Sequence, residues 1–205
     1  MPGGASPIGT AAQSGTYAVG VRIGGYGFRR NNDMNDANSW NECRMNGLGV
    51  FAQRALRGPF FLEAGLDTYF SIGQGESTDL PLDRQNVLVS AAVGVRTNVT
   101  SWLRGYAQVG TGVELDRLSV PYASSTISDD KALPEAFFGF GGDIRLARQT
   151  YVGATIRVLV MGNFDYDPAR LQMSNQWVAA PSSSDVFSAS PDLAAQAQFY
   201  VRREL

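Results

Sequence analysis

Residues 60–72 read FFLEAGLDTYFSI, and their side chains alternate between two sets along the segment. One set is almost entirely apolar and consists of Phe60, Leu62, Ala64, Leu66, Thr68, Phe70 and Ile72. The other set carries the charges and consists of Phe61, Glu63, Gly65, Asp67, Tyr69 and Ser71. Because successive side chains of a β-strand point to opposite faces, this period of two predicts a strand with one apolar and one charged face.

The same pattern recurs along the chain, and no stretch shows an apolar stripe of helical period and length. We expect eight strands, at about 17–28, 44–56, 60–72, 87–96, 103–115, 136–146, 151–160 and 193–202. In the first of them the apolar parity shifts after Gly24-Gly25, which predicts a β-bulge at this pair. The chain is therefore expected to be all-β.

The connections between these strands alternate in length. Long polar stretches occupy 29–43, 73–84, 116–134 and 163–192, and short ones occupy 57–59, 97–101 and 147–150. A barrel that spans an outer membrane has tight turns at one rim and long loops at the other, and an even number of strands brings both termini to the tight-turn rim. The pattern predicts an eight-stranded antiparallel up-and-down transmembrane β-barrel as a single domain over 16–205, preceded by a flexible segment over 1–15.

The composition excludes several classes of function. A net charge of −2 lacks the basic excess that binds a nucleic-acid backbone, so we expect no nucleic-acid partner. The chain has no histidine, which excludes Ser-His, Cys-His and His-metal sites. A single cysteine, Cys43, allows no internal disulfide and no zinc set. Residues 31–42 are rich in Asn and Asp but miss the EF-hand spacing, and turns use the same residues, so we expect no metal and no cofactor.

Alternation alone does not show whether the apolar face points into a core or out into lipid. A soluble lipocalin-like carrier of an apolar ligand would turn that face inward and need a well-solvated exterior. The polar parity holds mostly Gly, Ala, Ser, Gln and Tyr, and only Lys131 among the 17 basic residues is a lysine. Small residues with isolated charges favour a crowded lumen, so we prefer the membrane barrel and keep the soluble carrier as an alternative.

The charges on the polar parity are nearly balanced, which allows them to neutralise one another inside the barrel. Arginine suits this role because its forked donors bind carboxylates two at a time and stay charged. The expected lumen network consists of Arg22, Glu63, Asp67, Arg96, Arg104, Glu114, Asp143, Arg145, Arg157 and Arg202. This set predicts a charge-plugged lumen, with a narrow pore for small solutes or ions as the alternative.

With this architecture the chain resembles the small eight-stranded outer-membrane barrels typified by the OmpA membrane domain and OmpX. Near its end, Ala197, Phe199 and Val201 keep one parity, as in that family, although Arg203 interrupts the pattern and Leu205 stands where the family usually has an aromatic residue. The resemblance implies a monomer in a bacterial outer membrane, in contact with membrane lipid and lipopolysaccharide.

We expect no enzyme activity. Barrels of this size that act on lipid A or peptides use a histidine, which this chain lacks. Glu63 and Asp67 are four residues apart on one strand face, about 13 Å, which is too far for a glycosidase pair. A structural role, or recognition of an extracellular ligand or protein through the long loops, is expected instead. Aromatic residues in those loops are the recognition candidates: Trp40, Tyr166, Trp177 and Phe187.

Overall fold

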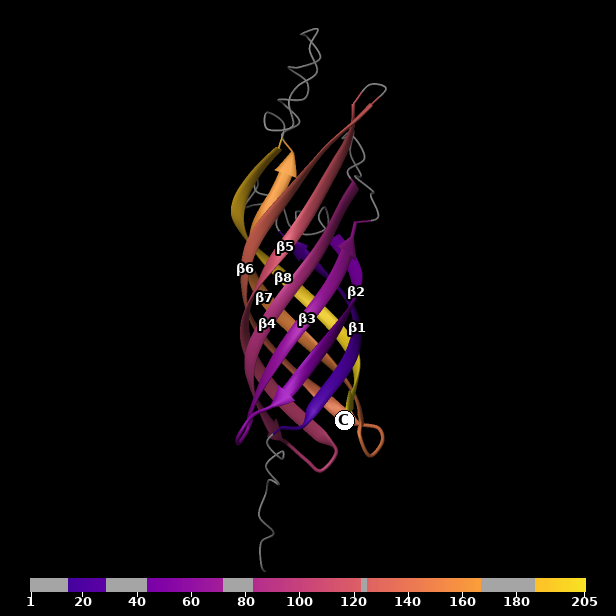
Figure 1. The fold of residues 1–205 in the computed structure, drawn as a ribbon, viewed down its shortest axis with the longest axis vertical. Coiled ribbons are helices and arrows are strands. Elements are labelled where there is room, and N and C mark those ends of the chain that lie inside the picture. The colour runs from indigo at the N-terminus through magenta and orange to yellow at the C-terminus, as the bar shows by residue number, and fades with distance from the viewer. Residues whose placement is uncertain (1–14, 29–43, 72–82, 123–124, 167–186) are drawn as a thin grey trace, which may run out of the picture.

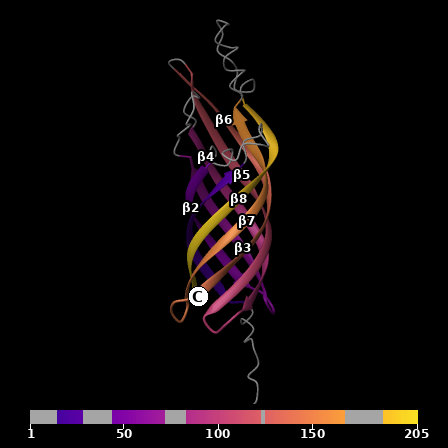
Figure 2. The same cartoon turned by 180° about the vertical axis from the view of Figure 1, so that it is seen from behind.

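The computed structural model describes residues 15–28, 44–71, 83–122, 125–166 and 187–205. Its strands are β1 (Tyr17–Phe28), β2 (Arg44–Ala55), β3 (Phe60–Phe70), β4 (Asp83–Asn98), β5 (Leu103–Tyr122), β6 (Ser125–Arg145), β7 (Thr150–Tyr166) and β8 (Phe187–Glu204). Each strand pairs antiparallel with the next, and β8 pairs with β1, so the eight strands close one barrel (Figures 1 and 2). The predicted all-β, eight-stranded up-and-down architecture is confirmed.

No helix in the described part of the chain is long and apolar enough to cross a membrane. Except for Gly15, the segment 1–15 that we expect to be flexible lies outside the described residues.

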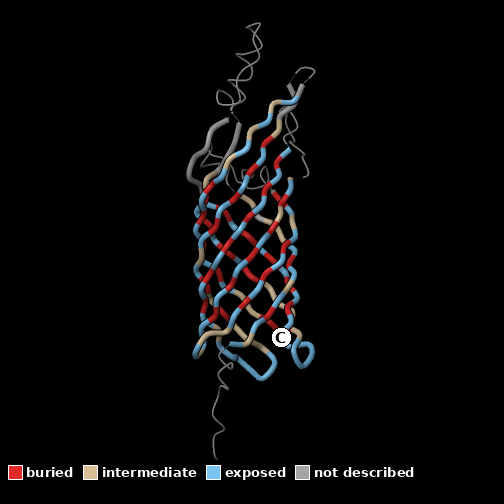
Figure 3. The backbone as a smooth tube through the Cα atoms, viewed as in Figure 1, coloured by how far each residue is buried: buried red, intermediate tan, exposed pale blue. Residues whose placement is uncertain are grey.

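Apolar side chains cover the outside of the barrel. Figure 3 shows buried and exposed positions alternating along the strands, and the exposed positions are the apolar parity of the sequence. In β3 this parity runs from Phe60 to Phe70, a distance of about 33 Å along the strand. Because the strand is tilted by about 40° from the barrel axis, the same residues span about 25 Å along the axis. An apolar band of about 25 Å is the height expected for an outer-membrane barrel. The soluble carrier would require the opposite orientation, so that alternative is wrong.

Three of the predicted long loops are shorter than expected, and the one at 73–84 is shorter because β4 begins at Asp83. Residues 116–122 and 125–134 belong to strands, because β5 and β6 pair from Leu115↔Ala132 to Tyr122↔Ser125. Residues 163–192 likewise contain strand ends, because β7 continues to Tyr166 and β8 begins at Phe187. Beyond the apolar band both faces of a strand can be polar, so apolar alternation no longer indicates pairing there.

The predicted bulge in β1 is also wrong. Register continues without interruption through Gly24↔Gly47 and Gly25↔Asn46 toward β2, and through Gly24↔Gln198 toward β8. The apparent change of parity has another origin. Tyr26 shares the backbone parity of Arg22, and an aromatic residue on this parity imitates a shift of the apolar pattern.

The tight connections lie together at one end of the barrel, with the C-terminus beside them (Figure 1). The β2–β3 turn uses Gly58 at φ 74°, in the left-handed region that favours glycine. At the same end Tyr17 and Trp102 are exposed, as expected for aromatic side chains at the border of the apolar band. This end is called the short-turn end below, and the opposite one the loop end.

Candidate functional site

The inward face of the barrel collects charged side chains from strands that are distant in sequence. At its centre Arg22 of β1 donates from Nη1 to Glu63 Oε1 at 2.9 Å and from Nε to Asp67 Oδ1 at 2.6 Å, both on β3. Arg157 of β7 donates to the same Glu63 oxygen at 2.8 Å from across the lumen. Gln53 of β2 donates to the other oxygen of Glu63 at 2.8 Å. We call Arg22, Glu63, Asp67 and Arg157 the central network.

The central network is withdrawn from solvent. Arg157 is 1 % exposed and Glu63 8 % exposed, and two arginines face two carboxylates, so the buried charges balance. Burial of ions is tolerated only where each has partners of opposite charge and good geometry, and this set meets both conditions. Gly65 leaves room for it, because a Cβ at that position would collide with the guanidinium of Arg22.

A second group of charges lies near the short-turn end. Arg202 donates to Asp143 Oδ2 from Nη2 at 2.7 Å and from Nε at 3.0 Å. Arg104 donates to Glu204 at 2.7 Å and to the Tyr151 hydroxyl at 2.7 Å. Arg202 also reaches Glu204 at 3.3 Å, so that carboxylate joins two arginines.

An aromatic cluster lies between the two groups of charges, and Gln53 connects them past it by donating to Glu63 at 2.8 Å and accepting from Arg96 at 2.6 Å. It consists of Phe51, Phe61, Tyr106 and Tyr200. Its rings meet edge to face, with centroids 5.6 Å apart for Phe51 and Tyr200 and 6.0 Å apart for Phe61 and Tyr106. The Arg22 guanidinium lies 5.3 Å from the ring centre of Phe51 on one side of the cluster. On the other side, the guanidinium of Arg96 lies 4.6 Å from the ring centre of Phe61.

Toward the loop end the interior holds an apolar cluster beside further buried charged side chains, among them Arg84, Glu114 and Glu135. A cluster of Met45, Tyr69, Leu88, Ala92, Phe137, Leu159, Met161 and Ala194 is buried there. The Tyr69 hydroxyl accepts hydrogen bonds from Gln196 at 2.8 Å and from Gln198 at 2.9 Å. Among the described residues, no group of three or more Cys, Asp or Glu side chains is arranged to hold a metal ion.

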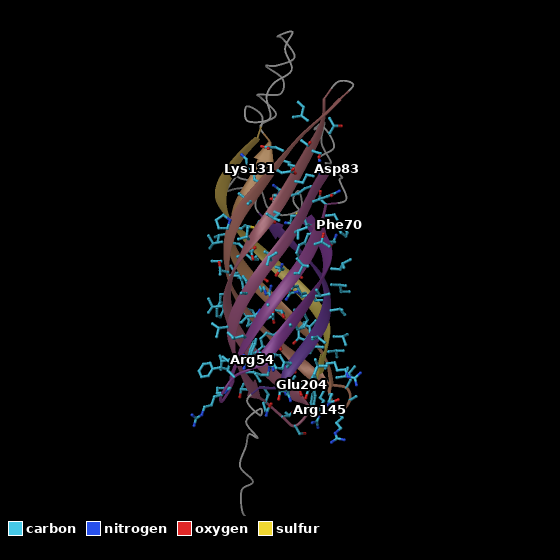
Figure 4. All side chains as sticks on the ribbon, viewed as in Figure 1. Arg54, Phe70, Asp83, Lys131, Arg145 and Glu204 are labelled. Carbon is cyan, nitrogen blue, oxygen red and sulfur yellow. The ribbon has the colours of Figure 1, made fainter. Side chains whose placement is uncertain are left out.

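The predicted lumen residues can now be placed. Nine of them lie on the inward parity of their strands: Arg22, Glu63, Asp67, Arg96, Arg104, Glu114, Asp143, Arg157 and Arg202. Arg145 does not join them, because β6 ends at this residue and its side chain is exposed at the short-turn end (Figure 4). At the end of a strand, parity no longer forces a side chain into the lumen.

Several inward residues were missed by the sequence reasoning. Arg84 and Asp116 fell within predicted loops, and Glu135 lay one residue before the predicted start of its strand, yet all three are buried. Glu204 was passed over although it shares the parity of Arg202, and this parity was the signal that could have found it.

Of the four aromatic residues predicted to act in recognition, two lie outside the described residues and two lie in strands. Trp40 and Trp177 lie outside the described residues. Tyr166 and Phe187 are not loop residues, because their backbones pair with each other as the last pair of β7 and β8.

No protein-family model matches the sequence, and no curated protein matches it. Solved structures are similar in fold. The neisserial surface protein A matches with a TM-score of 0.57 and 12 % identity over 94 % of this chain and 98 % of its own. A major outer membrane protein from Thermus thermophilus matches with a TM-score of 0.59 and 11 % identity over 94 % of this chain and 100 % of its own.

Ail, the attachment invasion locus protein of Yersinia pestis, is similar as well. It matches with a TM-score of 0.54 and 11 % identity over 94 % of this chain and 100 % of its own. One of its structures is a complex with the heparin analogue sucrose octasulfate. With the closed barrel, the outward apolar band and these neighbours, the chain has the fold of the small eight-stranded bacterial outer-membrane β-barrels.

Proposed function

We propose that this protein is an integral outer-membrane barrel of a Gram-negative bacterium, with a lumen closed by charges, that acts through its loop end in a structural or surface-recognition role. The observation that carries the proposal is the combination of an apolar exterior with an ion-paired interior. Exposed apolar side chains over a band of about 25 Å are stable only in contact with lipid. Membrane lipid and lipopolysaccharide are thus its immediate partners, and we expect a monomer.

Closure of the lumen is supported by two successive barriers. The central network links β1, β3 and β7 across the interior, with ion-pair distances of 2.9 Å for Arg22–Glu63 and 2.8 Å for Arg157–Glu63. The aromatic cluster then fills the section below it. An eight-stranded barrel has an interior just wide enough for its own side chains, so these groups disfavour a continuous aqueous path and with it the narrow pore.

A non-catalytic role fits the same interior. The buried carboxylates of the central network are engaged by arginines rather than directed at an open cleft. We therefore assign recognition to the connections that follow β1 and β7, whose sequences contain the candidate contact residues Trp40 and Trp177. An attachment protein, Ail, with the same fold supports a surface role.

The membrane location is tested by electrophoresis of detergent-folded protein with and without boiling, together with circular dichroism in detergent and in plain buffer. We expect the unboiled band to migrate differently and β-structure to form only with detergent or lipid. A monodisperse, folded protein in plain buffer would overturn the proposal. Planar-bilayer recordings test closure: stable single-channel steps would favour the pore.

Orientation is tested with two cysteine variants built on a Cys43→Ser background. Ser128 is exposed on the β5–β6 hairpin at the loop end, and Ser101 is exposed in the β4–β5 turn at the short-turn end. On intact cells a membrane-impermeant maleimide should label Ser128→Cys but not Ser101→Cys. The reverse pattern would place the loop end in the periplasm and remove the surface role.

A further inference from the structure

A cavity opens into the barrel at the short-turn end, below the aromatic cluster. Its volume is about 160 Å³, several times the roughly 30 Å³ that one water molecule occupies in the liquid. Three arginines line it, Arg96, Arg104 and Arg202, together with a single carboxylate, that of Glu204. The cavity is thus large enough for a small solute, and its charged lining is mainly positive.

The positive charges of this cavity are not fully balanced. Arg202 is paired with Asp143, and Glu204 is shared between Arg104 and Arg202. Among the residues that the structure describes, Arg96 makes no ion pair with a carboxylate. Its Nη2 donates to the neutral Gln53 amide at 2.6 Å, and its Nε is buried without a hydrogen-bond partner. Three guanidinium groups therefore face two carboxylates, and the surplus charge sits on Arg96.

The rim around the cavity adds to its positive potential. Arg54, Arg57, Arg145, Arg148 and Arg203 are all exposed at the short-turn end. Figure 4 shows Arg54, Arg145 and Glu204 at this end, while Asp83 and Lys131 lie at the other. A pocket of one sign of charge with low-dielectric walls concentrates counter-ions from solution.

We propose that this cavity is a binding site for a small oxyanion of the phosphate class, with Arg96 as its principal ligand. The forked donors of arginine match the oxygens of a phosphate, and Arg96 has no carboxylate partner that would compete with a bound anion. The cavity-lining side chains Phe61, Arg96 and Arg202 lie on the inward parity, so the site opens to the aqueous mouth rather than to the lipid-facing surface. This site requires only the barrel fold and is independent of any role of the loop end.

The test is calorimetric titration of detergent-folded protein with inorganic phosphate, in maltoside micelles at constant ionic strength. We expect saturable binding of one phosphate, weakened at least tenfold in Arg96→Gln. Glu204→Gln removes the only carboxylate of the lining and should tighten binding severalfold. Arg145→Gln removes an exposed charge of the same end outside the cavity, and its affinity should stay within twofold of the wild type.

The outcomes separate the cavity from a general effect of charge. Absence of saturable binding to the wild-type protein would overturn the proposal for free phosphate, as would equal losses in Arg96→Gln and Arg145→Gln. A second arm replaces free phosphate with short-chain phosphatidylglycerol in the micelles, and the arm that shows binding dependent on Arg96 identifies the source of the anion. If neither arm shows it, the site does not exist. Should Arg96→Gln fail to fold, unchanged affinity in Glu204→Gln would overturn the proposal.

Discussion

Replacing Glu63 by glutamine removes one negative charge from the centre of the barrel and leaves the shape of the side chain almost unchanged. In the wild-type protein this carboxylate accepts from Arg22 at 2.9 Å, from Arg157 at 2.8 Å and from Gln53 at 2.8 Å. Arg22 keeps Asp67 as a partner in the variant. Arg157, which is 1 % exposed, loses the carboxylate with which it pairs.

The size of the effect follows from leaving a buried charge without its partner. Such a change destabilises a protein by about 3–5 kcal/mol, far more than the roughly 0–1 kcal/mol of an exposed pair. With a denaturant dependence of about 2 kcal/mol per molar urea, the unfolding midpoint should fall by about 1.5–2.5 M. A cycle with Arg157→Met should give a coupling free energy of about 1–3 kcal/mol, because the two residues are in direct contact.

The assay is urea unfolding of protein folded into lipid vesicles, followed by circular dichroism. Asp130→Asn is the matched control, since its ion pair with Arg117 is 3.7 Å long and both side chains are more than half exposed. We expect the control to lose less than about 0.5 kcal/mol. Equal losses in Glu63→Gln and Asp130→Asn would show that water solvates the lumen charges, and would refute the reasoning from burial.

Four further substitutions test the exterior, the packing of the central network and the aromatic cluster by the same unfolding assay. Leu66→Arg, at the middle of the apolar band, should cost about 2–4 kcal/mol and Phe70→Arg, near its edge, about 0–1 kcal/mol; equal costs would contradict a lipid-embedded band. Gly65→Ala places a Cβ against the guanidinium of Arg22 and should cost about 1–3 kcal/mol, so an unchanged midpoint would show that the arginine moves aside freely. Phe61→Ala empties part of the aromatic cluster and should cost about 3–5 kcal/mol; a loss below about 1 kcal/mol would mean that the cluster is loosely packed.

The strand faces could be predicted because a membrane barrel imposes one rule on every residue within the bilayer. Lipid requires an apolar side chain at alternate positions, and the parity of Leu66 or Val89 shows this without any knowledge of neighbours. The same rule ends where the bilayer ends. Residues 116–122 and 125–134 pair as strands, yet charged residues occur on both parities, as Asp116 and Arg117 show, so no uniformly apolar face distinguished them from a loop.

The ion pairs inside the lumen were harder to predict than the set of side chains that point into it. Which arginine meets which carboxylate depends on the tilt and stagger of the strands, and these follow from closure of the whole barrel. Arg22 and Arg157 come from β1 and β7, yet both reach Glu63 of β3. Parity alone was also insufficient for Arg145, which has the inward parity but is exposed because β6 ends at this residue.

The strands of this barrel differ widely in length, so one side of the barrel is taller than the other and its sides are not equivalent to a neighbour in the membrane. β3 has 11 residues, whereas β6 has 21, and the β5–β6 hairpin rises well above β3 (Figure 1). At about 3.3 Å per residue and a tilt of about 40°, ten extra residues raise one side of the described wall by about 25 Å. A molecule that binds across this uneven end would therefore be tilted toward the shorter strands. A neighbour in the membrane would contact the β5–β6 hairpin only when it approaches from the side of the barrel that carries it.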